Sequence, residues 1–145
     1  MEGSEQMRIV ILDDDKDICK LLETALSAKG HDVTSYTDPT KGPFLHAQEC
    51  PCEPLDSCAD AILADIVMPN VEGIDFIKII KEAGCWPLSI GNVAIMSGYL
   101  TLHYMDDLNA MGVEYFRKPF HLDVIYKWAE ECEKRLAAAK EKLDE

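Results

Sequence analysis

Short apolar stretches alternate along the chain with longer segments in which apolar residues recur every three or four positions. Short apolar runs rich in β-branched or aromatic residues are typical of strands. Such runs predict five strands, at residues 8–12, 31–36, 60–65, 93–97 and 114–119. The first and third runs are apolar enough to be buried on both faces, which is typical of a parallel sheet.

Helical spacing of apolar residues fills the segments between these strands and continues after the last one. The first helix contains Ile18, Leu22 and Leu26, and Gly30 follows as its expected C-cap. Further helices are predicted at 38–47 (weakened by Gly42 and Pro43), 73–84, 101–112 and from residue 122 almost to the chain end. This alternation implies right-handed crossovers. The predicted fold is therefore α/β, a doubly wound five-stranded parallel sheet covered on both faces.

Polar side chains follow four of the five predicted strands. They are Asp13 and Asp14 after the first, Asp65 at the end of the third, Ser97 at the end of the fourth and Lys118 near the end of the fifth. In open parallel sheets, ligands bind beyond the carboxyl ends of the strands. We therefore expect these residues to converge at one edge of the sheet.

Three carboxylates at one edge repel one another, which raises their pKa values or pushes the loops apart. A hard divalent cation removes this conflict, and Mg²⁺ favours oxygen ligands from one or two carboxylates, water and phosphate. Lys118 offers a positive charge and Ser97 a hydroxyl for phosphoryl oxygens. A carboxylate can itself be phosphorylated. The residues therefore predict phosphoryl transfer onto an aspartate, with Mg²⁺ as the cofactor.

Charge and composition narrow the possible partners. The 145 residues carry a formal net charge of −13, which argues against direct binding to nucleic acid or to an anionic membrane. No stretch approaches the ~18 apolar residues of a membrane span. The first six residues, MEGSEQ, lack the form of a signal peptide. We therefore expect a cytoplasmic protein.

Four stretches together resemble the receiver domain of two-component response regulators. These are ILDDD at the first strand, AILADIVMPNVEG around the third, VAIMSGY at the fourth and GVEYFRKPF at the fifth. The resemblance covers residues 7–132 and implies a flavodoxin-like receiver fold of five βα units. It also implies a signalling module rather than an enzyme. Such a module catalyses only its own phosphoryl uptake and slow autodephosphorylation.

The resemblance also implies roles for individual residues. Asp65 would accept the phosphoryl group from a sensor histidine kinase or a phosphotransfer protein. Asp14 would bind Mg²⁺ directly, Asp13 largely through water, and Val67 through its backbone carbonyl. Ser97 and Lys118 would hold the phosphoryl oxygens. Met68, Pro69 and Gly73 match the turn that follows the third strand in this family.

The resemblance makes Ser97 and Tyr115 the switch residues, which would change the face formed by the fourth helix, fifth strand and fifth helix. Val67 and Tyr99 occupy the two positions that tune dephosphorylation. Because an apolar and an aromatic residue impede an attacking water, a long-lived phosphoryl state is predicted. Asp15 has no metal role and is instead expected to cap the first helix.

Two other functions fit part of the pattern. A phosphatase of the haloacid dehalogenase type would use Asp13 as its nucleophile, together with Asp15, Ser97 and Lys118. That family expects an acidic pair after the lysine, whereas the segment KPFHLDVIYKW offers only Asp123. The other alternative is a receiver-like interaction module that is never phosphorylated.

The two ends of the chain lie outside the expected receiver. Residues 1–6 are an N-terminal extension, and residues 133–145 extend the last helix. That helix carries apolar or small residues at heptad spacing: Leu122, Ile125, Ala129, Cys132, Leu136, Ala139 and Leu143. The pattern fits a helix packed on the sheet. It fits equally well a helix that pairs in a homodimer or leads as a coiled coil into an output domain.

The chain has six cysteines, which are expected to be reduced thiols in a domain without a leader. Three of them, Cys50, Cys52 and Cys58, follow His46 in the segment before the third strand. Four soft ligands could hold Zn²⁺, and the Cys-x-Cys pair could sense redox state. A proline-rich loop of reduced thiols explains the segment as well.

Overall fold

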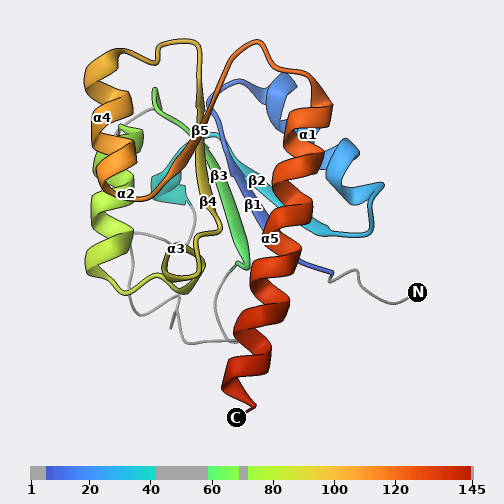
Figure 1. The fold of residues 1–145 in the computed structure, drawn as a ribbon. Coiled ribbons are helices and arrows are strands. Elements are labelled where there is room, and N and C mark those ends of the chain that lie inside the picture. Colours follow the sequence, from blue (N-terminus) through green and yellow to red (C-terminus); the bar gives the residue numbers. More distant parts are fainter. Residues whose placement is uncertain (1–5, 42–58, 69–71, 145) are drawn as a thin grey trace.

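The computed structural model describes residues 6–41, 59–68 and 72–144. Five parallel strands form one sheet in the order β2-β1-β3-β4-β5. Their bounds are β1 Arg8–Leu12, β2 Asp32–Tyr36, β3 Ala61–Asp65, β4 Val93–Ser97 and β5 Glu114–Arg117. Helices cover both faces, with α1 and α5 on one side and α2 and α4 on the other (Figure 1). The predicted doubly wound parallel α/β fold is confirmed.

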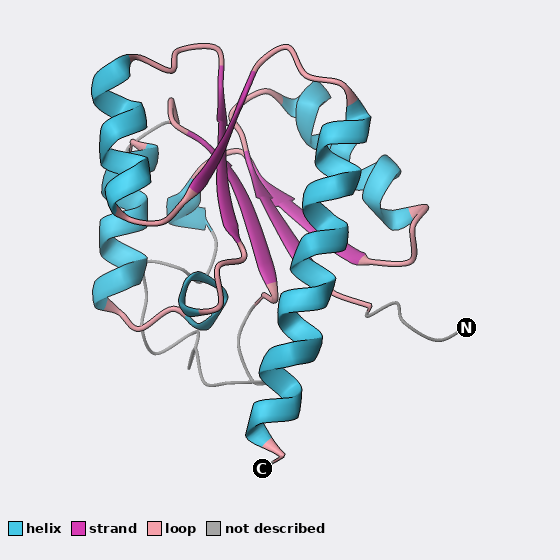
Figure 2. Ribbon diagram, viewed as in Figure 1, coloured by secondary structure: helices cyan, strands magenta, loops and turns pink. Residues whose placement is uncertain are grey.

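The helices agree with the prediction at most positions (Figure 2). Their bounds are α1 Lys16–Ser27, α2 Gly73–Glu82, α3 Trp86–Ser89, α4 Leu102–Ala110 and α5 Leu122–Leu143. The helix predicted at 38–47 is a 3-10 turn over Pro39–Lys41, and its remaining residues lie outside the described part of the chain. The short helix α3 was not predicted, because four residues that include Pro87 carry no helical periodicity.

The three central strands are buried on both faces, as their apolar sequences predict. Alternate side chains of each strand point to opposite faces, so the sheet separates two apolar clusters. Ile9, Ile11 and Leu63 pack toward α1 and α5, where Trp128 and Leu22 are fully buried. The alternate strand residues pack toward α2 and α4, where Phe76 and Leu108 are fully buried; they include Val10, Leu12, Ile62 and Ile95. The edge strands β2 and β5 are only partly buried.

The apolar stripe of α5 faces the chain's own sheet. Four of its heptad residues are buried there: Ile125, Ala129, Cys132 and Leu136. Ala139 packs against the same cluster. Leu143 is 48% exposed, and it is the exposed heptad position left for pairing with another chain. The heptad pattern is therefore explained by packing within the domain as far as Ala139.

Polar contacts of Asn92 and His31 tie α5 to the edge where the strands begin. The buried Asn92 side chain donates to the carbonyl oxygens of Asp60 and Cys132, both at 3.1 Å, and accepts from Arg135 Nε at 2.8 Å. His31 Nε2 lies 3.2 Å from Glu133 Oε2.

No helix in the described part of the chain combines the length and the apolar character that a membrane span needs.

Candidate functional site

Three aspartates meet at the carboxyl edge of the sheet. Asp13 and Asp14 follow β1, Asp65 ends β3, and these two strands are neighbours. One carboxylate oxygen from each residue lies within 4.8 Å of the other two. Asp13 is fully buried and Asp65 is 6% exposed, whereas Asp14 is exposed to solvent. The predicted convergence of these three side chains is therefore observed.

Lys118 joins the aspartates from the end of β5. Its Nζ lies 2.6 Å from Asp13 Oδ2 and 2.9 Å from Asp65 Oδ2. Its backbone N–H donates to the Ser97 carbonyl at 2.8 Å. The lysine therefore bridges two carboxylates that belong to different strands, and it offsets part of their mutual repulsion.

Ser97 ends β4 and is almost fully buried. Its Oγ accepts a hydrogen bond from the Tyr99 N–H at 2.9 Å. Met96 pairs with Asp65 across the sheet, so Ser97 stands one residue beyond Asp65 on the neighbouring strand. The hydroxyl is thus held at the same edge as the acidic residues, and its hydrogen can still be donated.

The three consecutive aspartates take different positions at the end of β1. Asp13 Oδ1 accepts from the Asp15 N–H at 2.9 Å, which closes a tight turn. Asp15 Oδ1 accepts from the N–H groups of Asp17 and Ile18 at the start of α1. The predicted cap is confirmed. Asp14 and Asp15 are both exposed to solvent, and Asp14 is the one whose carboxylate belongs to the acidic group.

The surroundings shift the pKa of two groups. Burial raises the pKa of Asp13, against the lowering effect of the Lys118 hydrogen bond. Burial lowers the pKa of Lys118, but its hydrogen bonds to Asp13 and Asp65 outweigh burial and raise that pKa above its ordinary 10.5. Lys118 is therefore charged at neutral pH, and the charged form of Asp13 is less favourable in the folded protein than in the unfolded chain.

Asp13→Asn is expected to raise the free energy of unfolding at pH 7 by about 1 kcal/mol. The folded protein binds a proton on Asp13 more tightly than the unfolded chain, where the pKa is 3.8. The charged carboxylate therefore destabilises the fold above its folded-state pKa, and this penalty disappears as the pH falls through 3.8. Urea unfolding at pH 7 and at acidic pH, without divalent ions, measures the effect.

Asp106→Asn, at an exposed position of α4, is the control for net charge and is expected to change stability little at either pH. An Asp13→Asn protein that is less stable than wild type at pH 7 would contradict the prediction.

Gly73 explains how the turn after β3 stays close to Asp65. The Gly73 N–H donates to the Ile66 carbonyl at 2.6 Å. A Cβ at this position would lie 2.7 Å from the Asp65 carbonyl oxygen, so any side chain would displace the strand end that carries the carboxylate. The Val67 N–H donates to Asp65 Oδ1 at 3.2 Å and helps to orient that carboxylate. Pro69 lies outside the described residues.

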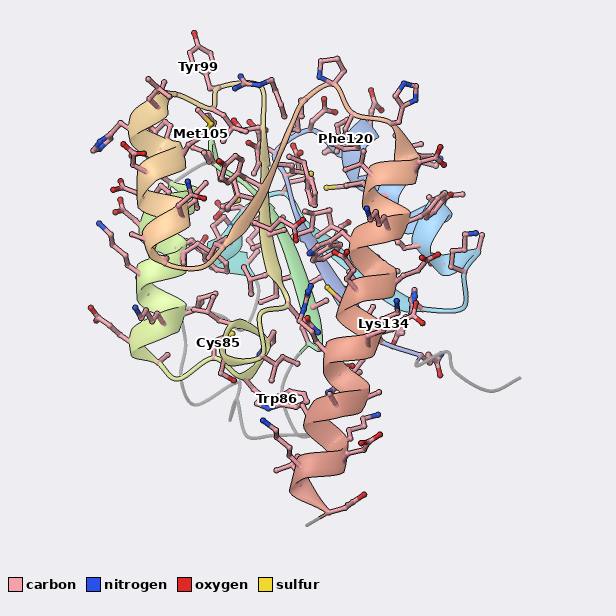
Figure 3. The ribbon with its side chains drawn as sticks, in the orientation of Figure 1. Cys85, Trp86, Tyr99, Met105, Phe120 and Lys134 are labelled. Atoms are coloured by element: carbon pink, nitrogen blue, oxygen red, sulfur yellow. The ribbon has the colours of Figure 1, made fainter. Side chains whose placement is uncertain are left out.

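Two tyrosines lie at the predicted positions but in different surroundings. Tyr115 on β5 is partly buried and packs against the cluster under α2 and α4. Tyr99 follows β4, is 73% exposed, and points away from the body of the molecule (Figure 3). Val67 is 53% exposed. Both proposed tuning residues are therefore accessible to solvent.

The cysteines divide into two groups. His46, Cys50, Cys52 and Cys58 lie outside the described residues, so the predicted zinc or redox site stays a prediction. Cys19, Cys85 and Cys132 are buried free thiols, and burial raises the pKa of Cys132 to about 12. Sequence reasoning missed one contact: Cys19 Sγ donates to the Asp13 carbonyl oxygen at 3.2 Å. The helical spacing of α1 predicts burial at this position but not this contact.

The donor set at the acidic edge suits a hard divalent cation. Asp13, Asp14 and Asp65 offer only oxygen atoms, and Asp14 opens the group to solvent. Mg²⁺ favours this combination of carboxylates with room for water and for a phosphate oxygen. The residues present therefore fit the predicted magnesium ion.

Comparisons of the sequence with known proteins agree on one protein family. The sequence family described as the response regulator receiver domain matches residues 9–130. The uncharacterized transcriptional regulatory protein YrkP of Bacillus subtilis is 28% identical over 113 residues, which cover 78% of this chain and 43% of YrkP. The nisin biosynthesis regulatory protein NisR of Lactococcus lactis is 29% identical over 119 residues, which cover 79% of this chain and 45% of NisR. The chain thus spans less than half the length of these relatives.

Solved structures agree with the sequence comparisons. The receiver domain of the Francisella response regulator 1452 is 26% identical and superposes with a TM-score of 0.69. The match covers 90% of this chain and 98% of the Francisella domain.

Proposed function

Because this chain belongs to the response regulator receiver family, we propose that it is a phosphoacceptor in a two-component pathway and that Asp65 takes the phosphoryl group. The donor would be a sensor histidine kinase or a phosphotransfer protein. The observation that carries the proposal is the contact of Lys118 with both Asp13 and Asp65, 2.6 and 2.9 Å from its Nζ. A cytoplasmic location, expected from the sequence, is part of the same proposal.

Accessibility favours Asp65 over Asp13 as the acceptor. Asp13 is fully buried, and its two carboxylate oxygens accept from the Asp15 N–H and from Lys118. Asp65 retains some exposure at the end of its strand. A carboxylate that attacks phosphorus must be reached by a large donor, and Asp65 meets this condition better. The buried Asp13 therefore counts against the phosphatase alternative, in which it would be the nucleophile.

Lys118 and Ser97 would bind the transferred group. In our proposal, an Asp65 oxygen attacks phosphorus, the bond to the donor nitrogen breaks, and the electron pair leaves with that nitrogen. Lys118 is already 2.9 Å from the attacking carboxylate, so its charge is near the oxygens that become more negative. The Ser97 hydroxyl would donate to one of these oxygens. Lys118 needs no long movement to act.

Asp13, Asp14, Asp65 and the Val67 carbonyl would hold Mg²⁺. When bound, this ion supplies positive charge that offsets the negative charge of the carboxylates and of the incoming phosphoryl group. The exposed Asp14 would provide the most accessible of these ligands.

The output would arise at the face formed by α4, β5 and α5. Ser97 would turn toward the phosphoryl group, and Tyr115 would follow by moving deeper against the cluster under α4. Tyr115 already packs on that cluster and is only partly buried, so both positions are compatible with its surroundings. The result is a shift between two conformations of this face, and the charge of the phosphoryl group biases the equilibrium between them.

Uptake from a small phosphodonor tests the proposal. Purified protein would be incubated with acetyl phosphate and either Mg²⁺ or EDTA, and its intact mass measured. We expect a single phosphoryl adduct in Mg²⁺ and none in EDTA. No adduct from acetyl phosphate or from phosphoramidate would favour the alternative of a receiver-like module that is never phosphorylated.

Val67→Asn combined with Tyr99→Glu is expected to shorten the lifetime of the phosphoryl state about tenfold, which corresponds to about 1.4 kcal/mol in activation free energy. The native side chains are apolar and aromatic and stand in solvent beside the acidic edge. Polar replacements can hydrogen-bond and orient a water for attack on phosphorus. Decay of the adduct after removal of acetyl phosphate measures the lifetime.

Leu102→Asn is the control, because Leu102 is about as exposed as Tyr99 but lies three residues further along the chain. The same lifetime for the double variant and wild type would contradict the tuning role of Val67 and Tyr99.

A further inference from the structure

A buried thiol contacts the backbone that carries two of the acidic residues. Cys19 lies on α1, is 4% exposed, and its Sγ is 3.2 Å from the Asp13 carbonyl oxygen. We propose that Cys19 is a positioning residue of the acidic site, whose thiol donates to this carbonyl and fixes the peptide that joins Asp13 to Asp14. This inference rests on the proposed Mg²⁺ site.

The contact completes the restraint of Asp13. Its N–H donates to the Tyr36 carbonyl at 3.2 Å, and its side chain accepts from the Asp15 N–H at 2.9 Å. The Asp13 carbonyl is the remaining polar backbone group, and Cys19 supplies its donor. Since the next residue is Asp14, the orientation of this peptide sets the direction in which the Asp14 carboxylate leaves the chain.

Restraint matters here because the site gathers like charges. Three carboxylate oxygens within 4.8 Å of one another repel, and repulsion favours loop conformations that separate them. A backbone held in place keeps the carboxylates together before any cation arrives, so less conformational freedom is lost on binding. In metal sites, groups that orient the ligands often change metal affinity by about 10- to 100-fold when removed.

The sulfur of Cys19 is itself held in place. It packs in the apolar cluster between the sheet and helices α1 and α5. The Ser35 hydroxyl of β2 lies beside the thiol, and Ser35 donates in turn to Glu23 of α1. A buried position on a helix needs only an apolar side chain for packing. The thiol adds a donor that alanine or leucine at this position would lack.

Metal affinity distinguishes a role of Cys19 in positioning the acidic residues from a role in packing alone. Mn²⁺ takes the same oxygen ligands as Mg²⁺, and its free concentration can be read by electron paramagnetic resonance. The variants are Cys19→Ala, which removes the donor, Cys19→Ser, which keeps one, and Cys132→Ala. The last is the control, because Cys132 is fully buried in the same cluster but lies on α5, where its sulfur accepts from Arg135 and does not contact Asp13.

We expect Cys19→Ala to weaken Mn²⁺ binding about 3- to 10-fold, below the usual range because a thiol is a weak donor. Cys19→Ser should recover most of the affinity. Cys132→Ala should lower the melting temperature but leave the Kd for Mn²⁺ within about twofold of wild type, since its cavity is remote from the ligands.

Three results would overturn the inference. They are a Cys19→Ala protein that binds Mn²⁺ as tightly as wild type, an equal loss of affinity in Cys132→Ala, and a serine variant as weak as the alanine variant. The last would show that the volume of the sulfur matters and its hydrogen bond does not. A wild-type protein that binds no Mn²⁺ would instead overturn the proposed metal site, and the role of Cys19 with it.

Discussion

Asp65→Asn is expected to take up no phosphoryl group from acetyl phosphate, whereas the wild-type protein gains a single adduct. The amide is nearly the same size as the carboxylate and can still accept a hydrogen bond from Lys118, but its oxygen is a far weaker nucleophile. Loss of uptake would therefore report the chemistry of the side chain rather than its packing. The mass of the intact protein, measured after incubation in Mg²⁺, gives the result directly.

Asp13→Asn distinguishes the receiver from the phosphatase alternative. If Asp65 is the acceptor, this variant should still form an adduct, at a reduced rate because one proposed metal ligand is lost. If Asp13 were the nucleophile, the adduct would disappear in Asp13→Asn and persist in Asp65→Asn. An adduct that survives in both single variants would mean that neither residue is the acceptor.

Lys118→Met is expected to slow phosphoryl uptake by about 10²-fold or more, the usual cost of removing a group that stabilises developing charge. Methionine keeps most of the length and apolar volume of lysine but has no charge. In the folded protein the lysine ammonium lies between two carboxylates, 2.6 Å from Asp13 and 2.9 Å from Asp65. Without it, the acidic edge repels a phosphodonor that is itself an anion.

The control for Lys118→Met is Lys127→Met, an equal loss of charge at an exposed position of α5. This variant should take up the phosphoryl group at the wild-type rate. Initial rates of adduct formation, measured at several acetyl phosphate concentrations, compare the two proteins. Equal rates for Lys118→Met and wild type would exclude a role for the lysine in the transfer.

The location of the acidic site follows from the rules of parallel sheets. The strands of such a sheet point the same way, and this predicted that Asp13, Asp65 and Lys118 converge at one edge. The bridge from Lys118 to both carboxylates was not predicted. The cap at Asp15 followed from the chemistry of free N–H groups at a helix start. These inferences use only the direction of the chain and the type of residue.

The remaining features depend on which surface each residue meets. The heptad spacing of α5 predicts an apolar stripe, but a stripe that packs on the domain's own sheet and one that pairs with a second chain have the same spacing. The buried Leu136 and the contacts of Asn92 with Cys132 and Arg135 show that the stripe packs on the domain's own sheet as far as Ala139. The contact of Cys19 with the Asp13 carbonyl could not be predicted either. Helical spacing indicates which face of the helix a side chain is on, but not which atoms it touches.

The attachment of α5 has a practical consequence for experiments that label or immobilise the protein. The helix has 22 residues, and at 1.5 Å per residue it is about 33 Å long. Its first turn lies beside the loops that follow the strands, and its last turn emerges at the opposite end of the molecule (Figure 1). A fluorescent protein or surface anchor joined there would leave the acidic edge open to a large phosphodonor.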